Sequence, residues 1–485
     1  MKRERVNPQQ QPTGAGSFGH RPQSRNISRR ELLGSVSTGF GMTALSALMA
    51  DPAYSGLAGT PGPHHAPTAK NVVFLFMSGG VSHMDTFDPK PKLAELDGTK
   101  ATLDNYTAGP NRKWLGSPWK FRQHGESGAM VSELFPHVAT CVDDLSILRS
   151  MKSDFPLHPR SNIKMHTGRN VGGYPSLGSW ITYGLGSENR DLPGYVLLDG
   201  GAVPPGGVEN FSSGFLPASH QATSVAADGV PIHNLAPADG DAVQRAKLEA
   251  VIEQDHLLAR SQGGDDAIES AIRNYELAYR MQSLLPDVLD LSKENAETKR
   301  DYGLEAEERE ARRYATQCLR ARRLIEAGVR FVEITCAEVY GGNNGTWDQH
   351  TDLKKGHEGN ARITDQPVAQ LLKDLKARGM LDETLVVWAT EFGRTPDTGN
   401  GDGRDHHETG FTIWMAGGGV RKGLVYGNTD ELGVHAVENV MTVHDLHATI
   451  LHLVGLDHER LTYRFGGRDI SLTDVHGRVV HDLIV

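Results

Sequence analysis

The chain has 485 residues, with 60 acidic against 50 basic side chains and a formal net charge of −10. Hydrophobic residues make up 38% of it, enough to bury a core, which excludes a disordered or collagen-like chain. The acidic balance argues against nucleic acid as a partner, because phosphate contacts need a surplus of lysine and arginine. The three cysteines are widely spaced, which excludes a disulfide framework and a zinc ribbon.

The beginning of the chain is typical of an export signal. Residues 1–27 are polar and basic, and Arg29 and Arg30 then precede a modestly apolar run, Leu32–Ala50. Paired arginines ahead of such a run are the twin-arginine pattern, and the run is too short and too rich in Gly, Ser and Thr for a stable transmembrane span. We therefore predict a signal and cleavage region over 1–58 and a linker over 59–69. The expected partner is the twin-arginine translocase, and the expected location is periplasmic or extracellular.

Strands and helices alternate along residues 70–485. Asn71–Met77 is apolar along its whole length, as in a strand covered on both faces, and Leu145–Arg149 predicts a second strand. Long helices are predicted over 241–262, over 266–285 with Pro286 as its breaker, and over 304–327. These helices form a helical insertion at about 241–327.

The second half of the chain continues the alternation. It predicts strands over 329–335, 385–390 and 411–416, a helix that begins near Asp365, and a helix over 443–454. Alternating strands and helices are typical of parallel βαβ units. We therefore predict a single α/β domain over 70–485, with a largely parallel sheet sandwiched between helices.

Polar residues gather where the predicted strands end. In open α/β sheets ligands bind beyond the carboxyl ends of the strands, so these loops are expected to converge at one edge. Imidazole with carboxylate suits zinc, manganese or iron, and carboxylate alone suits calcium or magnesium. We predict a divalent metal (zinc, manganese or calcium) held by ligands drawn from Asp348, His350, Asp405, His406, His407, Glu391 and Asp85.

Two further polar features leave alternatives open. His158 and Ser161 precede a predicted helix over Ile163–His166, and the free N–H groups of a helix start suit a nucleophile or an anion, although Ser161 also fits an ordinary helix cap. Arg394 follows a buried strand and either holds a phosphate or sulfate group or forms a structural ion pair.

At these residues the chain resembles the alkaline phosphatase and sulfatase superfamily. His158–Arg169 resembles the sulfatase signature Cys-x-Pro-Ser-Arg followed by Thr-Gly-Arg, and Ala389–Gly393 resembles the Ser-Asp-His-Gly segment. Asn71–Met77 resembles the first strand, which in that superfamily ends in a metal-binding acid, and 443–456 resembles its late helix. The resemblance implies an alkaline-phosphatase-like α/β fold.

More closely, the chain resembles a family of exported, sulfatase-like proteins of unknown function. The residues that carry this likeness are Arg29-Arg30, Ser78-Gly79-Gly80, Thr167-Gly168, Asp405-His406-His407 and Thr462-Tyr463-Arg464-Phe465. It covers nearly all of the chain that follows the predicted signal.

The departures from the superfamily pattern fall on its chemistry. Ser78 or Gly79 stands where the first metal acid is expected, and Glu391-Phe392 replaces the later Asp-His pair. His158 stands where sulfatases have the cysteine that becomes formylglycine, which excludes a formylglycine sulfatase. Asp348, His350 and one or more of residues 405–407 remain to build a site that resembles the superfamily's Asp/His/His set.

The leading hypothesis is an exported metal-dependent hydrolase of phosphate- or sulfate-type esters, on a small molecule or a polysaccharide. In it, Ser161 or His158 attacks the ester and Arg394 stabilises the developing oxyanion. The alternative is a catalytically degenerate relative that acts as an exported binding or surface-assembly protein. The lost first acid and Phe392 favour that alternative.

Overall fold

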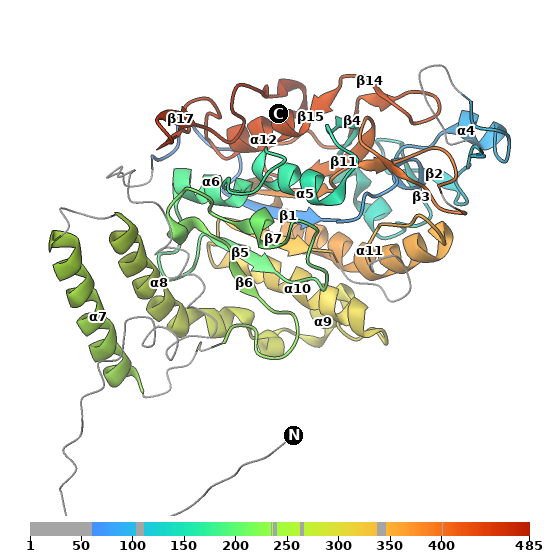
Figure 1. Cartoon of the computed structure of the whole chain (residues 1–485). Coiled ribbons are helices and arrows are strands. Elements are labelled where there is room, and N and C mark those ends of the chain that lie inside the picture. Colours follow the sequence, from blue (N-terminus) through green and yellow to red (C-terminus); the bar gives the residue numbers. More distant parts are fainter. Residues whose placement is uncertain are drawn as a thin grey trace, which may run out of the picture.

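The computed structural model describes residues 61–485 except 103–110, 234, 236–239, 262–265, 337–345 and 400, so the predicted signal region lies outside the described residues. Its centre is a nine-stranded sheet in the order β12-β4-β11-β8-β1-β7-β5-β6, with β15 paired to β4 (Figure 1). The strands are β1 Asn71–Phe76, β4 Leu145–Lys152, β5 Tyr195–Leu198, β6 Thr223–Val225, β7 Phe331–Thr335, β8 Thr384–Ala389, β11 Phe411–Ala416, β12 Leu424–Tyr426 and β15 Met441–Thr442.

The sheet is largely parallel, as the alternation of strands and helices predicts. Every described pair of neighbouring strands runs parallel except those of β11, which is antiparallel to both β4 and β8. The α/β class and the largely parallel sheet are therefore confirmed.

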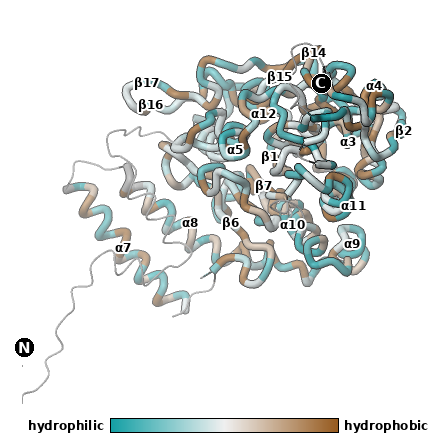
Figure 2. The backbone as a smooth tube through the Cα atoms, turned by 45° about the vertical axis from the view of Figure 1, so that its right-hand side comes forward, coloured by the Kyte–Doolittle hydropathy of each residue, from teal (hydrophilic) through white to brown (hydrophobic). Residues whose placement is uncertain are grey.

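Helices cover both faces of this sheet. α5 His158–Thr167, α6 Leu177–Leu185 and α12 Val443–Leu453 lie on one side, and α10 Arg309–Glu326 and α11 Leu353–Ala377 lie on the other (Figure 1). Successive side chains of a strand point to opposite faces. Accordingly, Val73 and Leu75 of β1 join the core beneath α10 and α11, whereas Val72 and Phe74 join the core beneath α6 and α12. Figure 2 shows hydrophobic stretches inside the body and hydrophilic ones around it.

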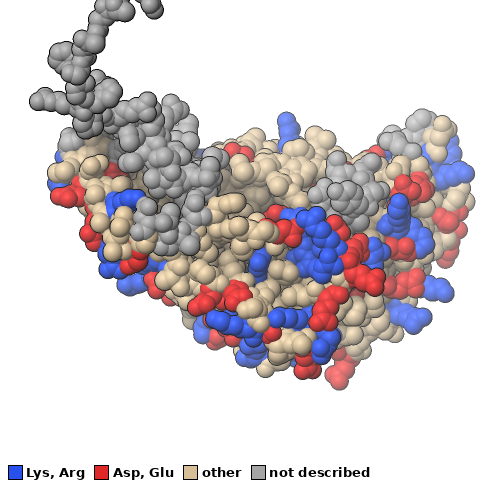
Figure 3. All heavy atoms as spheres, turned by 90° about the horizontal axis from the view of Figure 1, so that it is seen from below, with Lys and Arg blue, Asp and Glu red and all other residues tan. Residues whose placement is uncertain are grey.

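The remaining elements are shorter or lie at the periphery. The other helices are α3 His83–Thr86, α4 Pro91–Glu95, α7 Asp241–Ser261, α8 Asp266–Leu289 and α9 Ala296–Tyr302. The small antiparallel pairs are β2 Phe121–His124 with β3 Ala129–Ser132, β9 Gly393–Arg394 with β10 His406–His407, β13 Asn428–Thr429 with β14 Ala436–Glu438, and β16 Tyr463–Phe465 with β17 Arg468–Ile470. On the face seen in Figure 3, basic and acidic residues are interspersed across much of the described surface.

Four predicted helix boundaries are wrong, and one of them is the start of α10, which begins at Arg309 rather than near 304. Pro286 does not end its helix, since α8 continues to Leu289 and only one backbone donor is lost near its end. α11 begins at Leu353 rather than near Asp365, because its first half buries polar residues such as His357 and its apolar spacing becomes regular only later. α5 begins at His158 rather than at Ile163, which places His158 at the helix start.

The stretch predicted as a linker contacts the domain where it is described. The backbone N–H groups of Gly62, His64 and Thr68 donate to the carbonyls of Gly184, Gly455 and Leu453. This stretch is therefore attached near the ends of α6 and α12. Within the described residues, no helix combines the length and apolar character needed to cross a bilayer.

The sheet register brings the polar loops to one edge. Phe76 pairs with both Thr335 and Ala389, so β1, β7 and β8 end at the same level. β11 runs the other way, so the residues that precede it also lie at this edge. The predicted convergence at one edge thus depends on one antiparallel strand, whose direction the sequence analysis did not assign.

Candidate metal centre

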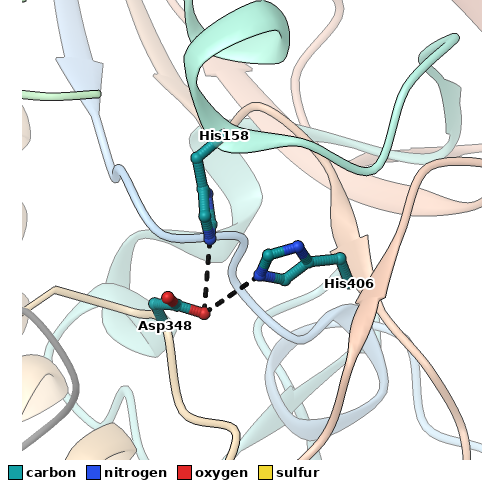
Figure 4. A group of neighbouring side chains, drawn as sticks. All are labelled: His158, Asp348 and His406. Carbon is teal, nitrogen blue, oxygen red and sulfur yellow. Dashed lines mark hydrogen bonds and ion pairs between the residues drawn. The ribbon is translucent and has the colours of Figure 1, made fainter. Parts of the chain in front are cut away.

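One carboxylate oxygen lies at the centre of the polar group at this edge. Asp348 Oδ1 is 2.5 Å from Arg394 Nη2, 3.1 Å from His350 Nε2, 3.2 Å from His406 Nε2 and 3.3 Å from His158 Nε2. Figure 4 shows the rings of His158 and His406 pointing at this oxygen from two different segments. Three imidazoles and a guanidinium therefore meet at one atom.

Separate elements supply these side chains. His158 is the first residue of α5 and is followed by a proline in the first turn, a position that proline favours. Asp348 and His350 lie in the loop between β7 and α11. His406 of β10 pairs with Arg394 of β9, so this short hairpin delivers both a ring and a guanidinium.

Two of the rings are oriented through their second nitrogen. His406 Nδ1 lies 2.8 Å from the Pro156 carbonyl oxygen, which only accepts, so Nδ1 carries the proton. His158 Nδ1 lies 2.6 Å from Glu391 Oε1, again an acceptor. In the neutral rings each Nε2 then presents its lone pair to the centre, which is the arrangement that metal-binding histidines use.

His350 completes the set from the other side. Its Nδ1 lies 3.6 Å from Asp405 Oδ1, and its Nε2 lies 2.9 Å from His406 Nε2. Asp405 is held in turn by Arg112, 2.5 Å away. Two lone pairs at 2.9 Å repel one another unless a proton or a cation lies between them.

The donor set fits a divalent transition metal. Two groups of three potential ligands share His406: His158 with Asp348, and His350 with Asp405. A tetrahedral ion with bonds of about 2.0 Å separates its donor atoms by about 3.3 Å, close to the observed spacings. His158 Nε2 is buried and makes no hydrogen bond. Imidazoles with a carboxylate suit zinc, manganese or iron better than calcium or magnesium.

The pKa values of Asp348 and His158 show how the charges of the centre are balanced without an ion. Burial alone would raise the pKa of Asp348, but its close contacts with the three histidines and the charge of Arg394 hold it well below its usual range. Burial lowers the pKa of His158, but the carboxylates of Asp348 and Glu391 outweigh burial and raise it to about 9. Without an ion, a proton on His158 therefore balances part of the negative charge.

Arg394, predicted as an oxyanion clamp, directs its N–H groups at oxygens of the protein itself. Its fully buried guanidinium donates from Nε to Gly80 O at 2.8 Å, from Nη1 to Arg404 O at 3.1 Å, and from Nη2 to Gly79 O and Asp348. This arrangement holds Asp348 in place and leaves little capacity to bind a substrate oxygen.

Glu391, predicted as a metal ligand, lies behind His158. Its carboxylate is fully buried and accepts hydrogen bonds from Gly79 N–H at 2.9 Å and from His158. A side chain at Gly79 is excluded, because φ is +116° and an added Cβ would lie 2.5 Å from Trp347 N. An acid at this position, as the superfamily pattern expects, therefore does not fit this backbone.

Asp85 and Ser161 lie apart from the centre. Both oxygens of Asp85 bond Arg404, at 2.7 and 3.1 Å, and the two side chains are fully buried. The Ser161 hydroxyl donates to Phe155 O at 2.6 Å. The structure thus groups neither of them with the converging imidazoles.

His407 also lies apart, although it is next to His406. Adjacent residues of a strand point to opposite faces, so the two rings diverge from β10. His407 Nε2 contacts Val434 O and lies 2.8 Å from Thr409 Oγ1. The sequence pattern Asp-His-His thus contributes its first histidine to the centre and its second to a different contact.

A pocket of about 260 Å³ borders the centre. The apolar part of its lining comes from the loop after β5. The sequence analysis did not single out this loop, although the short apolar run of β5, followed by Asp199 and two glycines, could have indicated a strand with a loop at the same edge of the sheet. The ring of Phe392 lies over His158 and His406, 4.8 and 4.9 Å between centroids. The lining residues are Ser78, Gly79, His158, Gly201, Ala202, Val203, Pro205, Thr346 and Asp348.

The chain belongs to the family described as Protein of unknown function (DUF1501), whose model matches residues 69–484. No curated protein sequence matches it. Among solved structures it is similar to the PsFucS1 sulfatase from Pseudoalteromonas sp., at 13% identity and a TM-score of 0.35, covering 87% of this chain and 72% of that one. It is also similar to the alkaline phosphatase from the Antarctic bacterium TAB5, at 10% identity and a TM-score of 0.33, covering 80% and 98%.

Proposed function

We propose that this chain is an exported, divalent-metal-dependent hydrolase of phosphate- or sulfate-type esters. The observation that carries the proposal is the convergence of three imidazole Nε2 atoms on one oxygen of Asp348, with an acceptor on the Nδ1 side of each ring. The motifs shared with the alkaline phosphatase and sulfatase superfamily support the reaction class.

Each residue has a part in this proposal. His158, His350, His406 and Asp348 would hold the ion, which when bound polarises an ester oxygen and lowers the pKa of a bound water. Glu391 and Asp405 orient two of the rings, and Arg394 fixes the carboxylate. The proposal thus moves His158 from attacking group to ligand and Arg394 from oxyanion clamp to positioning residue.

The neighbouring pocket is where an ester would bind. Ser78 and Thr346 supply hydroxyl groups to its lining together with Asp348, and Ala202 and Pro205 supply apolar surface. A reacting group in this pocket would lie next to the proposed ligands. Export rests on the twin arginines, Arg29 and Arg30, which precede the apolar run.

One observation favours the second candidate, a binding protein without catalysis. Phe392 covers the rings of His158 and His406 at the place where the superfamily pattern has a histidine. If this ring blocks the open coordination position, the centre would be a structural metal site, since catalytic sites keep one position free.

Metal content separates these possibilities. The mature chain, purified without chelator, should contain about one or two divalent ions by mass spectrometry, and His406→Ala should lose them. His407→Ala is the matched control, because it removes the adjacent histidine of the same strand, whose buried ring contacts Val434 and Thr409 instead of the centre. Failure of the wild-type chain to take up zinc, manganese or calcium would overturn the proposal.

Activity is then measured with aryl phosphates, phosphate diesters and aryl sulfates, with and without the retained ion. Turnover that disappears in His406→Ala and persists in His407→Ala supports the hydrolase. A metal-loaded chain that turns over none of these esters supports the binding protein.

A further inference from the structure

We infer that the pocket beside the metal centre selects a singly charged ester, a phosphate diester or a sulfate monoester, over a doubly charged phosphate monoester. This inference rests on the proposed function and adds the charge class of the substrate to it. The observations that carry it are the charge balance of the centre, the absence of a cation from the described pocket lining, and the apolar wall around Val203.

The charged groups around the ligands cancel once one divalent ion is bound. Three carboxylates touch the imidazoles, those of Asp348, Glu391 and Asp405, and two guanidiniums pair with them, those of Arg394 and Arg112. Arg112 also pairs with a fourth, fully buried carboxylate, that of Asp397, 3.3 Å away. With neutral imidazoles these groups leave two negative charges, and one divalent ion brings their sum to zero. The centre therefore holds no surplus positive charge to offset the second negative charge of a phosphate monoester.

The described lining of the pocket offers no further positive side chain. Its members are hydroxyl, glycine, aliphatic and proline residues together with His158 and Asp348, and none of them is lysine or arginine. Arg394, the nearest guanidinium to Asp348, is fully buried and directs its N–H groups to backbone carbonyls and to Asp348. A phosphate monoester, which carries close to two charges above pH 7, therefore finds no second cation here.

The apolar part of the pocket lining favours an organic substituent. Ala202, Val203 and Pro205 form it, and Val203 is 70% exposed. A methyl or aryl group placed there removes apolar surface from water, which favours binding, whereas a charged oxygen at the same place loses hydration without a partner. Val203 thus becomes the residue that determines charge selectivity.

Three probes that share a phenyl group test this inference on the full metal-loaded chain at pH 8. They are methyl phenyl phosphate and phenyl sulfate, each singly charged, and phenyl phosphate, which is doubly charged at that pH. Calorimetry should give a Kd for one of the singly charged probes at least about fivefold lower than for phenyl phosphate. The singly charged probe that binds more tightly shows whether the preferred substrate class is the phosphate diester or the sulfate monoester.

Val203→Arg should lower the ratio of the Kd of phenyl phosphate to the Kd of the singly charged probe by about two- to fivefold, because it adds an exposed cation to the apolar part of the lining. Val208→Arg is the matched control: Val208 is 74% exposed and lies outside the described lining. Tightest binding of phenyl phosphate, no measurable binding of any probe, or equal effects of the two variants would each overturn the inference. Metal content, measured first, shows separately whether the proposed function has failed.

Discussion

Two arginine–aspartate pairs lie side by side in this fold and differ in what else touches the carboxylate. Arg404 and Asp85 form a closed pair: the Ser82 hydroxyl lies 2.5 Å from Asp85 Oδ2, and Arg404 Nη1 donates to Thr395 O at 3.2 Å. Arg394, which also bonds the Arg404 carbonyl, shares Asp348 with three imidazoles at the wall of a pocket. The comparison teaches that a buried carboxylate paired with an arginine is not by itself a candidate metal site. What marks Asp348 as a candidate ligand is the convergence of three imidazole rings on its carboxylate.

The largest expected effect is on stability, at the closed pair. Arg404→Met leaves Asp85 as a buried charge without its partner, and breaking such a pair costs about 3–5 kcal/mol. Urea unfolding of the metal-free protein measures this loss. The double variant with Asp85→Asn should recover a large part of it, and a loss below about 1 kcal/mol in the single variant would contradict the closed pair.

The next largest effect is on metal affinity, where two buried glutamates, Glu391 and Glu333, should differ. Glu391→Gln removes the charged acceptor behind His158, and changes of this kind typically weaken metal binding by about 10- to 100-fold. Competition with a chelator measures it. Glu333→Gln is the matched control, because Glu333 is equally buried and lies 2.8 Å from another histidine, His166, away from the centre. Equal losses in both variants would mean that Glu391 acts only through general stability.

The pH dependence of the stability of the metal-free chain tests the contacts that His158 makes with Asp348 and Glu391, which have no counterpart at the Arg404–Asp85 pair. The pKa of His158 is raised to about 9 in the folded state, so its stabilisation is present below its unfolded value of about 6.5 and is lost as pH rises through 9. Stability should fall between pH 7 and 10 by on the order of 2 kcal/mol. His158→Ala should flatten this part of the profile, and an unchanged slope in that variant would contradict the assignment.

The smallest effect concerns Ser161, for which the sequence left a nucleophile open. Its hydroxyl donates a hydrogen bond to the Phe155 carbonyl oxygen. Ser161→Ala should therefore lower the free energy of unfolding by about 1 kcal/mol and leave turnover unchanged. Activity with the best ester of the panel measures the second part. A loss of turnover with intact metal content would return Ser161 to the reaction.

The sequence predicted the fold better than the site. Strands such as Phe411–Ala416 are almost entirely apolar because both faces are buried, so their positions were clear. The direction of that strand was not, since a buried run reads the same for parallel and antiparallel pairing. The helix start at His158 and the long first half of α11 were missed because those turns bury polar side chains rather than an apolar stripe.

Local patterns could name the candidate residues of the site but not their roles. Asp348, His350 and His406 were among the candidates because imidazole and carboxylate follow strand ends, and the structure brings them together. His406 and His407 are equivalent in a pattern and are separated only by the alternation of β10. Arg394 and Glu391 act behind the ligands, a distinction that depends on contacts with Gly79, which lies more than three hundred residues earlier in the chain.

The most direct test of the central claim is anomalous diffraction from crystals of the mature chain grown with the ion that it retains. The account predicts one strong peak bounded by Asp348 Oδ1 and the Nε2 atoms of His158, His350 and His406. Full metal occupancy without a peak among these four residues would contradict it.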